Sequence, residues 1–154
     1  MSRILANLKS LPIQGVNEAV TLAKLIDPIL REAGFDTEDI KSVEEEFSVE
    51  IDSETVIIDR CLKRRGKTLV FLQAKQVGRK NLFKNDVSKT RRVASKYQVP
   101  FIIFTDGVFW ELNKMIGLQP LIDYEKYMQI NLSYYPSKYQ EIITALKSLS
   151  KDWG

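Results

Sequence analysis

Residues 57–75 read IIDRCLKRRGKTLVFLQAK and carry the strongest structural signal in the chain. Two runs rich in apolar and β-branched residues, 54–62 and 68–75, flank the polar segment KRRGK at 63–67. Gly66 can adopt the positive φ that a tight turn between antiparallel strands requires. The stretch therefore predicts a β-hairpin.

Three polar residues lie near the open end of this hairpin. Asp59 is on the first strand, while Gln73 and Lys75 are on the second, two residues apart and therefore on one face. Since the turn is central between Asp59 and Gln73, the hairpin would bring these two side chains near each other. Such groups are costly in a core, whereas carboxylate and amide oxygens suit Mg²⁺. A lysine can offset phosphate charge, or orient or deprotonate the attacking water.

The residues before the hairpin predict two helices and a strand. Residues 2–10 have the spacing of a short amphipathic helix, and residues 18–33 that of a longer one. Asn17 is the expected N-cap of the second helix, and Gly34 is its expected stop. Residues 42–51 predict a strand with one shared face, made of Val43, Glu45, Phe47, Val49 and Ile51.

The residues after the hairpin predict two more helices and two strands. Residues 86–97 are polar with sparse apolar positions, which indicates a helix that packs one narrow stripe on a sheet. The apolar run at 101–104 predicts a buried strand, followed by a turn at 105–107 and a strand at 108–112. Residues 137–149 predict a closing amphipathic helix.

Length and composition narrow the class of protein. The 154 residues suit one α/β domain, and 44% hydrophobic residues with 28% charged residues argue against disorder. The absence of histidine excludes Ser-His-Asp, Cys-His and HExxH chemistry. One cysteine, Cys61, excludes an internal disulfide and a zinc cluster and fits a cytoplasmic location. No apolar run of about 18 residues is present, so no membrane association is expected.

The net charge of +3 averages two opposite blocks. Residues 36–59 contain ten acids and one base, a net charge of −9, whereas residues 60–96 contain thirteen bases and one acid, a net charge of +12. A long basic block is typical of a protein that binds a polyanion, although it can also be a solvated face. The basic block therefore favours nucleic acid as the partner.

The hairpin motif resembles that of the PD-(D/E)xK nuclease superfamily, in which an acid on one strand precedes an acid-x-Lys motif on the next. Gln73 stands at the second acid, and this Gln-x-Lys variant is similar to that of Mrr-like restriction enzymes. Over residues 17–112 the chain resembles the N-terminal nuclease domain of type I restriction enzyme R subunits. NEAVTLAKLIDPILREAGF places Glu18 at the family's helical acid, and VPFIIFTDGVFWEL is similar to the family's "TNG" strand-turn-strand.

This resemblance implies a single restriction-endonuclease-like domain over residues 1–154, with a mixed central β-sheet flanked by α-helices. It implies a DNA endonuclease that uses Mg²⁺ or Mn²⁺, with Asp59, Gln73, Lys75 and Glu18 catalytic and all of these except Lys75 as metal ligands. The nucleic-acid contacts expected in the basic block are Arg60, Arg64, Arg65, Lys67, Arg79, Lys80, Lys84, Lys89, Arg91 and Arg92.

Alternatives remain open at this point. A neutral Gln73 should weaken metal binding, which favours a catalytically silent DNA-binding module of the same fold. The acidic block favours an interaction subunit of a larger restriction or repair complex. A homodimer is also open, since one nuclease site of this kind cuts one strand at a time. At the residue scale, Asp59 could pair with Arg60 or Lys75, and Glu18 could be a first-turn acid favoured by the helix dipole.

Overall fold

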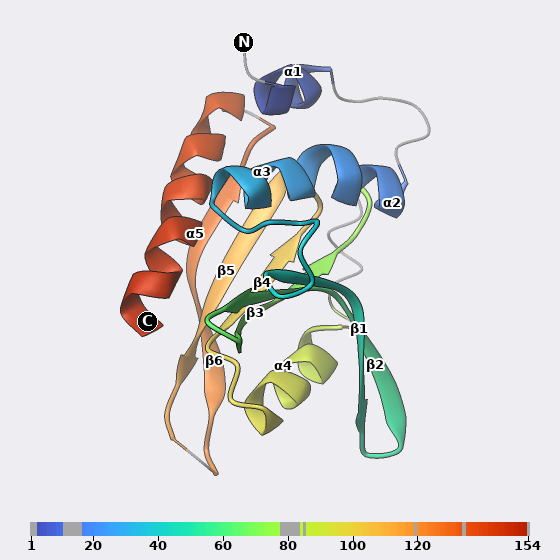
Figure 1. Cartoon of the computed structure of the whole chain (residues 1–154), viewed down its shortest axis with the longest axis vertical. Helices are drawn as coiled ribbons and strands as arrows, with labels where there is room; N and C mark the ends of the chain where they lie inside the picture. The colour runs from blue at the N-terminus through green and yellow to red at the C-terminus, as the bar shows by residue number, and fades with distance from the viewer. Residues whose placement is uncertain are drawn as a thin grey trace.

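The computed structural model describes residues 3–10, 17–77, 84, 86–118, 120–133 and 135–153, with the backbone alone for residues 150–153. These residues form one six-stranded sheet with helices on both faces (Figure 1). The predicted α/β fold with a mixed central sheet and flanking helices is confirmed. The described helices include none that is long and apolar enough to cross a bilayer.

The sheet has the order β1-β2-β3-β4-β5-β6. Its strands are β1 (Val43–Ile51), β2 (Glu54–Arg64), β3 (Lys67–Ala74), β4 (Phe101–Thr105), β5 (Phe109–Ile116) and β6 (Asp123–Asn131). Neighbours are antiparallel except β3 and β4, which are parallel. The helix α4 (Val87–Lys96) lies between β3 and β4 in the chain, as a parallel connection requires.

The helices divide between the two faces of the sheet. One face packs against α1 (Arg3–Lys9), α2 (Glu18–Thr21), the π-helical turn η1 (Leu22–Ile26), α3 (Asp27–Glu32) and α5 (Tyr139–Trp153). The other face packs against α4, whose Val93 and Ala94 are fully buried. In β4, Ile103 belongs to the first core and Ile102 to the second, so both faces of this strand are covered.

The predicted hairpin forms as expected. Arg65 and Gly66 are the two loop residues between β2 and β3, and their φ values are 54° and 77°. Positive φ at both positions is the signature of the type I′ turn, whose twist suits a two-residue hairpin. The pairing of Arg60 with Leu72 then sets the register of the predicted site.

The predicted single face of β1 is wrong. Val43 packs in the core beneath α3, whereas Val49 packs in the core beneath α4, so the strand changes face between them. Glu46 lies at the change with φ of 49°, in the left-handed region that non-glycine residues rarely adopt. On β2 the same change separates Ile58, beneath α4, from Leu62, beneath α3.

Other differences concern the length of elements. The predicted helix at 18–33 is present, capped by Asn17 Oδ1, which accepts from Val20 N at 2.9 Å, but η1 interrupts its regular geometry. β6 was not predicted, because it is an edge strand whose only buried residues are Tyr124 and Ile130. Such a strand has too few apolar positions to show alternation.

Candidate functional site

The site lies where β2 and β3 separate. Their pairing stops at Arg60 and Leu72, beyond which β2 stays paired with β1 while β3 stays paired with β4. Asp59 and Gln73 are the first residues beyond this last pair. Their backbone groups therefore face a gap between two strands instead of a regular ladder.

Side chains close this gap. Asp59 Oδ2 accepts a hydrogen bond from Ala74 N at 2.7 Å, and Gln73 Oε1 accepts from Asp59 N at 3.2 Å. Gln73 Nε2 donates to Ile57 O at 3.1 Å and to Thr90 Oγ1 on α4 at 3.2 Å. The hairpin thus brings Asp59 and Gln73 together as predicted. Because its amide spans β2, β3 and α4, Gln73 is a structural bridge, and its role as a metal ligand stays a prediction.

Asp59 lies in an electrostatic environment unlike that of a surface carboxylate. Burial raises its pKa to about 6, the hydrogen bond from Ala74 opposes this shift, and the charge of Glu18 adds to it. The charge of Lys75 acts in the opposite direction. Glu18 from α2, Asp59 from β2 and Lys75 just after β3 therefore lie close enough for their charges to influence one another, and these three predicted catalytic residues come from separate segments.

Lys75 is held by a residue that sequence reasoning did not select. Its Nζ is 2.7 Å from Oδ2 of Asp86, which precedes α4. Burial alone would lower the pKa of Lys75, but the hydrogen bond to Asp86 and the neighbouring carboxylates raise it above its usual value. Asp86 is the one acid in the basic block of residues 60–96, and a single acid among thirteen bases was the feature of the sequence that could have identified it as a partner of a basic residue.

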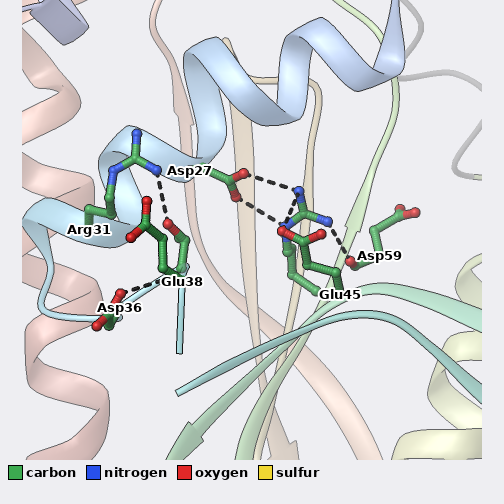
Figure 2. Close-up of polar contacts among 8 residues, drawn as sticks. Asp27, Arg31, Asp36, Glu38, Glu45 and Asp59 are labelled. Carbon is green, nitrogen blue, oxygen red and sulfur yellow. Dashed lines mark hydrogen bonds and ion pairs between the residues drawn. The ribbon is translucent and has the colours of Figure 1, made fainter. Parts of the chain in front are cut away.

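A buried ion pair supports Asp59 from the side of α3. Arg60 Nε and Nη2 each donate to Asp27 at 3.1 Å, and Arg60 Nη1 donates to the carbonyl of Asp59 at 2.9 Å (Figure 2). Glu45 Oε1 lies 3.7 Å from Arg60 Nη2. Figure 2 shows the Asp59 carboxylate pointing away from this pair. The pair therefore fixes the backbone of Asp59 and leaves its side chain to the site.

The expectation that Arg60 contacts a phosphate is wrong. Arg60 is only 7% exposed, and its guanidinium is already occupied by acceptors within the protein. Asp27 was missed because its partner is 33 residues away in the sequence. It also follows η1, whose extra residue per turn changes which side chains face the sheet.

The predicted phosphate contacts at the hairpin tip lie away from the site. Arg64 is five residues along β2 from Asp59, about 17 Å of strand. Its guanidinium packs over the ring of Phe35, 3.7 Å from the centroid. Arg65 and Lys67 are exposed at the turn. The structure does not bring these three cations together with Asp59.

The remaining predicted contacts lie on or near α4, or outside the described residues. On α4, Lys89 pairs with Glu54 at 3.6 Å and Arg92 pairs with Asp52 at 3.2 Å. Arg91 and Lys84 line a cleft beside α4. Arg79 and Lys80 lie outside the described residues.

Within the part of the chain that the structure describes, no three Asp, Glu or Cys side chains form a metal cluster. A cation at the site would therefore rely on the carboxylates of Asp59 and Glu18, supplemented by backbone and water oxygens.

Comparisons with known protein families, with curated proteins and with solved structures find no match for this chain. The fold and the site define it as an α/β protein with a mixed six-stranded sheet. Its particular feature is a cluster of acidic and basic side chains, Glu18, Asp59, Lys75 and Asp86, where two strands separate.

Proposed function

We propose that this protein is a metal-dependent phosphodiester hydrolase that acts on DNA, an endonuclease of the PD-(D/E)xK type. The observation that carries the proposal is the convergence of Glu18, Asp59 and Lys75 from three segments at the gap between β2 and β3. Asp59 and Lys75 are half-buried and Glu18 is exposed beside them, an arrangement that suits a divalent cation and a phosphate better than it suits a core.

The donor groups fit a hard cation. Burial and the charge of Glu18 both disfavour an ionised Asp59, and the charge of a divalent cation held by these residues would offset both effects. Asp59 and Glu18 would hold Mg²⁺ or Mn²⁺, with a backbone carbonyl near Leu72 or Ala74. When bound, the cation supplies a Lewis acid that lowers the pKa of water and withdraws charge from the phosphate.

The environment of Lys75 selects its role. Because carboxylates raise the pKa of this lysine, it stays protonated at neutral pH and is poorly suited to remove a proton from water. It would instead orient the attacking water and offset negative charge on the phosphate. Asp86 would keep the ammonium group in place, so we assign Asp86 a positioning role.

Gln73 supports a second candidate, a catalytically silent DNA-binding module of the same fold. Its amide is engaged by Asp59 N, Ile57 O and Thr90 Oγ1, so a third acidic ligand is replaced by a structural bridge. In either case we propose DNA as the partner and the cytoplasm as the location. A homodimer or a larger restriction or repair complex would supply further subunits.

Cleavage of supercoiled plasmid in Mg²⁺ or Mn²⁺ tests the hydrolase. We expect nicking by the wild type and a loss of at least about 100-fold in Asp59→Asn and Lys75→Met, which remove a carboxylate charge and an ammonium group. The matched control is Lys138→Met, an exposed lysine of the 3₁₀ helix η3 (Pro136–Lys138), which should cleave like the wild type.

Equal cleavage by all four proteins would indicate a contaminating nuclease and refute the assignment. DNA binding without cleavage would favour the silent module, and the absence of both would leave only the interaction subunit.

A further inference from the structure

A cleft of about 620 Å³ runs beside α4 and is separate from the residues assigned above to hydrolysis. It lies between the last residue of β1, Ile51, and the first residues of β6, Asp123 and Tyr124. We call it the α4 groove. A cleft of this volume is large enough for a nucleotide-sized ligand.

One face of α4 gives the groove its charge. Four basic side chains line it: Arg91, Arg92 and Lys96 on α4, and Lys84, which precedes the helix. Asp123 is the acidic residue among the lining side chains, and its carboxylate also accepts a hydrogen bond from Tyr124 N. The groove therefore concentrates positive charge, and its three cations on α4 span about 8 Å of the helix axis.

Arg91 indicates that the groove takes an acceptor. Its Nε is buried and has no hydrogen-bond partner among the described residues, whereas the guanidinium of Arg92 pairs with Asp52 and Glu54. A buried donor without a partner costs free energy that an anion would recover. A planar guanidinium is matched by the oxygens of a phosphate.

We propose that the α4 groove binds the phosphate backbone of the nucleic acid on which the candidate site acts. This inference rests on the proposed function. The helix that lines the groove begins beside that site, because Asp86, which holds Lys75, directly precedes α4. Several cations in one groove suit the repeated charges of a nucleic acid, although a free nucleotide or pyrophosphate offers the same phosphate chemistry.

Binding of a fluorescein-labelled DNA duplex of about 20 base pairs tests the groove by fluorescence anisotropy. EDTA is present throughout, so the readout is independent of cleavage. Lys96→Ala removes an exposed charge with little effect on folding, and Arg91→Lys keeps the charge but removes Nε. The control Lys138→Ala removes one positive charge on the α5 side of the molecule, and thermal unfolding monitors the fold of each variant.

We expect Lys96→Ala and Arg91→Lys each to weaken DNA binding about 5-fold or more, with less than about a 2-fold change for Lys138→Ala. In a salt series, Lys96→Ala should lower the slope of log affinity against log salt by about one. Groove variants that bind duplex like the Lys138→Ala control would overturn the proposal.

Competition by pyrophosphate and by AMP distinguishes the sources of phosphate. If groove variants lose affinity for these small anions but keep their affinity for duplex, the nucleic-acid ligand is refuted. Asp59→Asn separates this inference from the hydrolase, since it should abolish cleavage while duplex binding in EDTA stays within about 2-fold of the wild type.

Discussion

At the scale of single residues, Asp59 joins the backbone of β3 to the charges of the candidate site. Its Oδ2 accepts from Ala74 N, and burial together with Glu18 makes its ionised form unfavourable. The raised pKa has a consequence for stability. The folded protein holds this proton more tightly than the unfolded chain, so the stabilisation is fully present below pH 3.8 and is lost as the pH rises through about 6.

Asp59→Asn should therefore stabilise the metal-free protein at pH 7.5 by about 1–3 kcal/mol, because asparagine carries no charge and still offers an acceptor to Ala74 N. Near pH 4 most of this gain should disappear. Urea unfolding in EDTA at the two pH values measures it, beside Glu50→Gln, which neutralises an exposed carboxylate of β1. A variant no more stable than the wild type at pH 7.5 would contradict the assigned environment.

Gln73 offers a second test at this scale. Gln73→Glu restores the acid of the motif but cannot donate to Ile57 O or Thr90 Oγ1, and it adds charge beside Asp59. We expect a loss of about 1–3 kcal/mol in EDTA, and partial recovery in millimolar Mg²⁺ if a cation binds there. Thermal unfolding with and without Mg²⁺ measures both effects. Gln76→Glu makes the same change outside the bridge and should show neither the loss of stability in EDTA nor the recovery in Mg²⁺. Identical behaviour of the two variants would argue against a special role for Gln73.

At the scale of elements, the buried pair between α3 and β2 holds the site together. Arg60 joins Asp27 to the carbonyl of Asp59 just where β2 leaves β3. Such a pair is costly to bury and costly to break, since each partner alone would be an uncompensated charge. The pair between Asp27 and Arg60 therefore positions β2 against α3 as well as stabilising the fold.

Asp27→Asn should destabilise the protein by about 3 kcal/mol, because it leaves the buried Arg60 without its closest counter-charge. The double variant Asp27→Leu with Arg60→Met should recover most of this loss, since it removes both charges. Asp52→Asn, the same change in an exposed pair with Arg92, should cost less than about 1 kcal/mol. Urea unfolding of these variants gives the comparison, and equal effects of Asp27→Asn and Asp52→Asn would show that burial of the pair matters little.

The turn between β4 and β5 depends on a close approach to the helix above it. Gly107 has φ of 89°, and a Cβ there would lie 2.9 Å from Cβ and Cδ1 of Leu25 and 3.1 Å from Cγ2 of Thr21. Gly107→Ala should therefore cost about 2–4 kcal/mol, from backbone strain and overpacking together. Gly66→Ala, with φ of 77° and nothing within 4 Å of its Cβ, should cost about 1 kcal/mol from strain alone. Thermal unfolding of the two variants measures the difference. Equal losses of stability would show that the close approach of Gly107 to Leu25 of η1 has no effect.

At the scale of the whole molecule, the centre of the sheet is covered on both faces while its edges are not. Every residue of β4 is buried, whereas β6 is mostly exposed. Native-state hydrogen exchange should show the slowest amides in β3 and β4 and faster exchange in the edge strands β1 and β6. If β6 exchanged as slowly as β4, the edge would have to be covered, for example in an assembly with a second chain.

Local sequence patterns predicted a large part of this architecture. The turn at Gly66, the Asn17 cap and the apolar run at 101–104 each follow from short-range chemistry, and the corresponding elements are present. The face of β1 was not predictable in this way, since alternation cannot reveal a left-handed residue such as Glu46. β6 lacks apolar alternation, because an edge strand needs little of it.

The sequence by itself determined the hairpin, the order of the helices and of the first five strands, and the expectation that Asp59, Gln73, Lys75 and Glu18 belong to one site. These properties depend on residues that are close in the chain or on a motif with fixed spacing. The tertiary structure alone decided which polar groups meet. It pairs Asp27 with Arg60 and Asp86 with Lys75, and it places the Gln73 amide between the backbone of β2 and Thr90 of α4. The reason is physical, because partners from distant segments are selected by packing and burial, and those depend on the whole sheet.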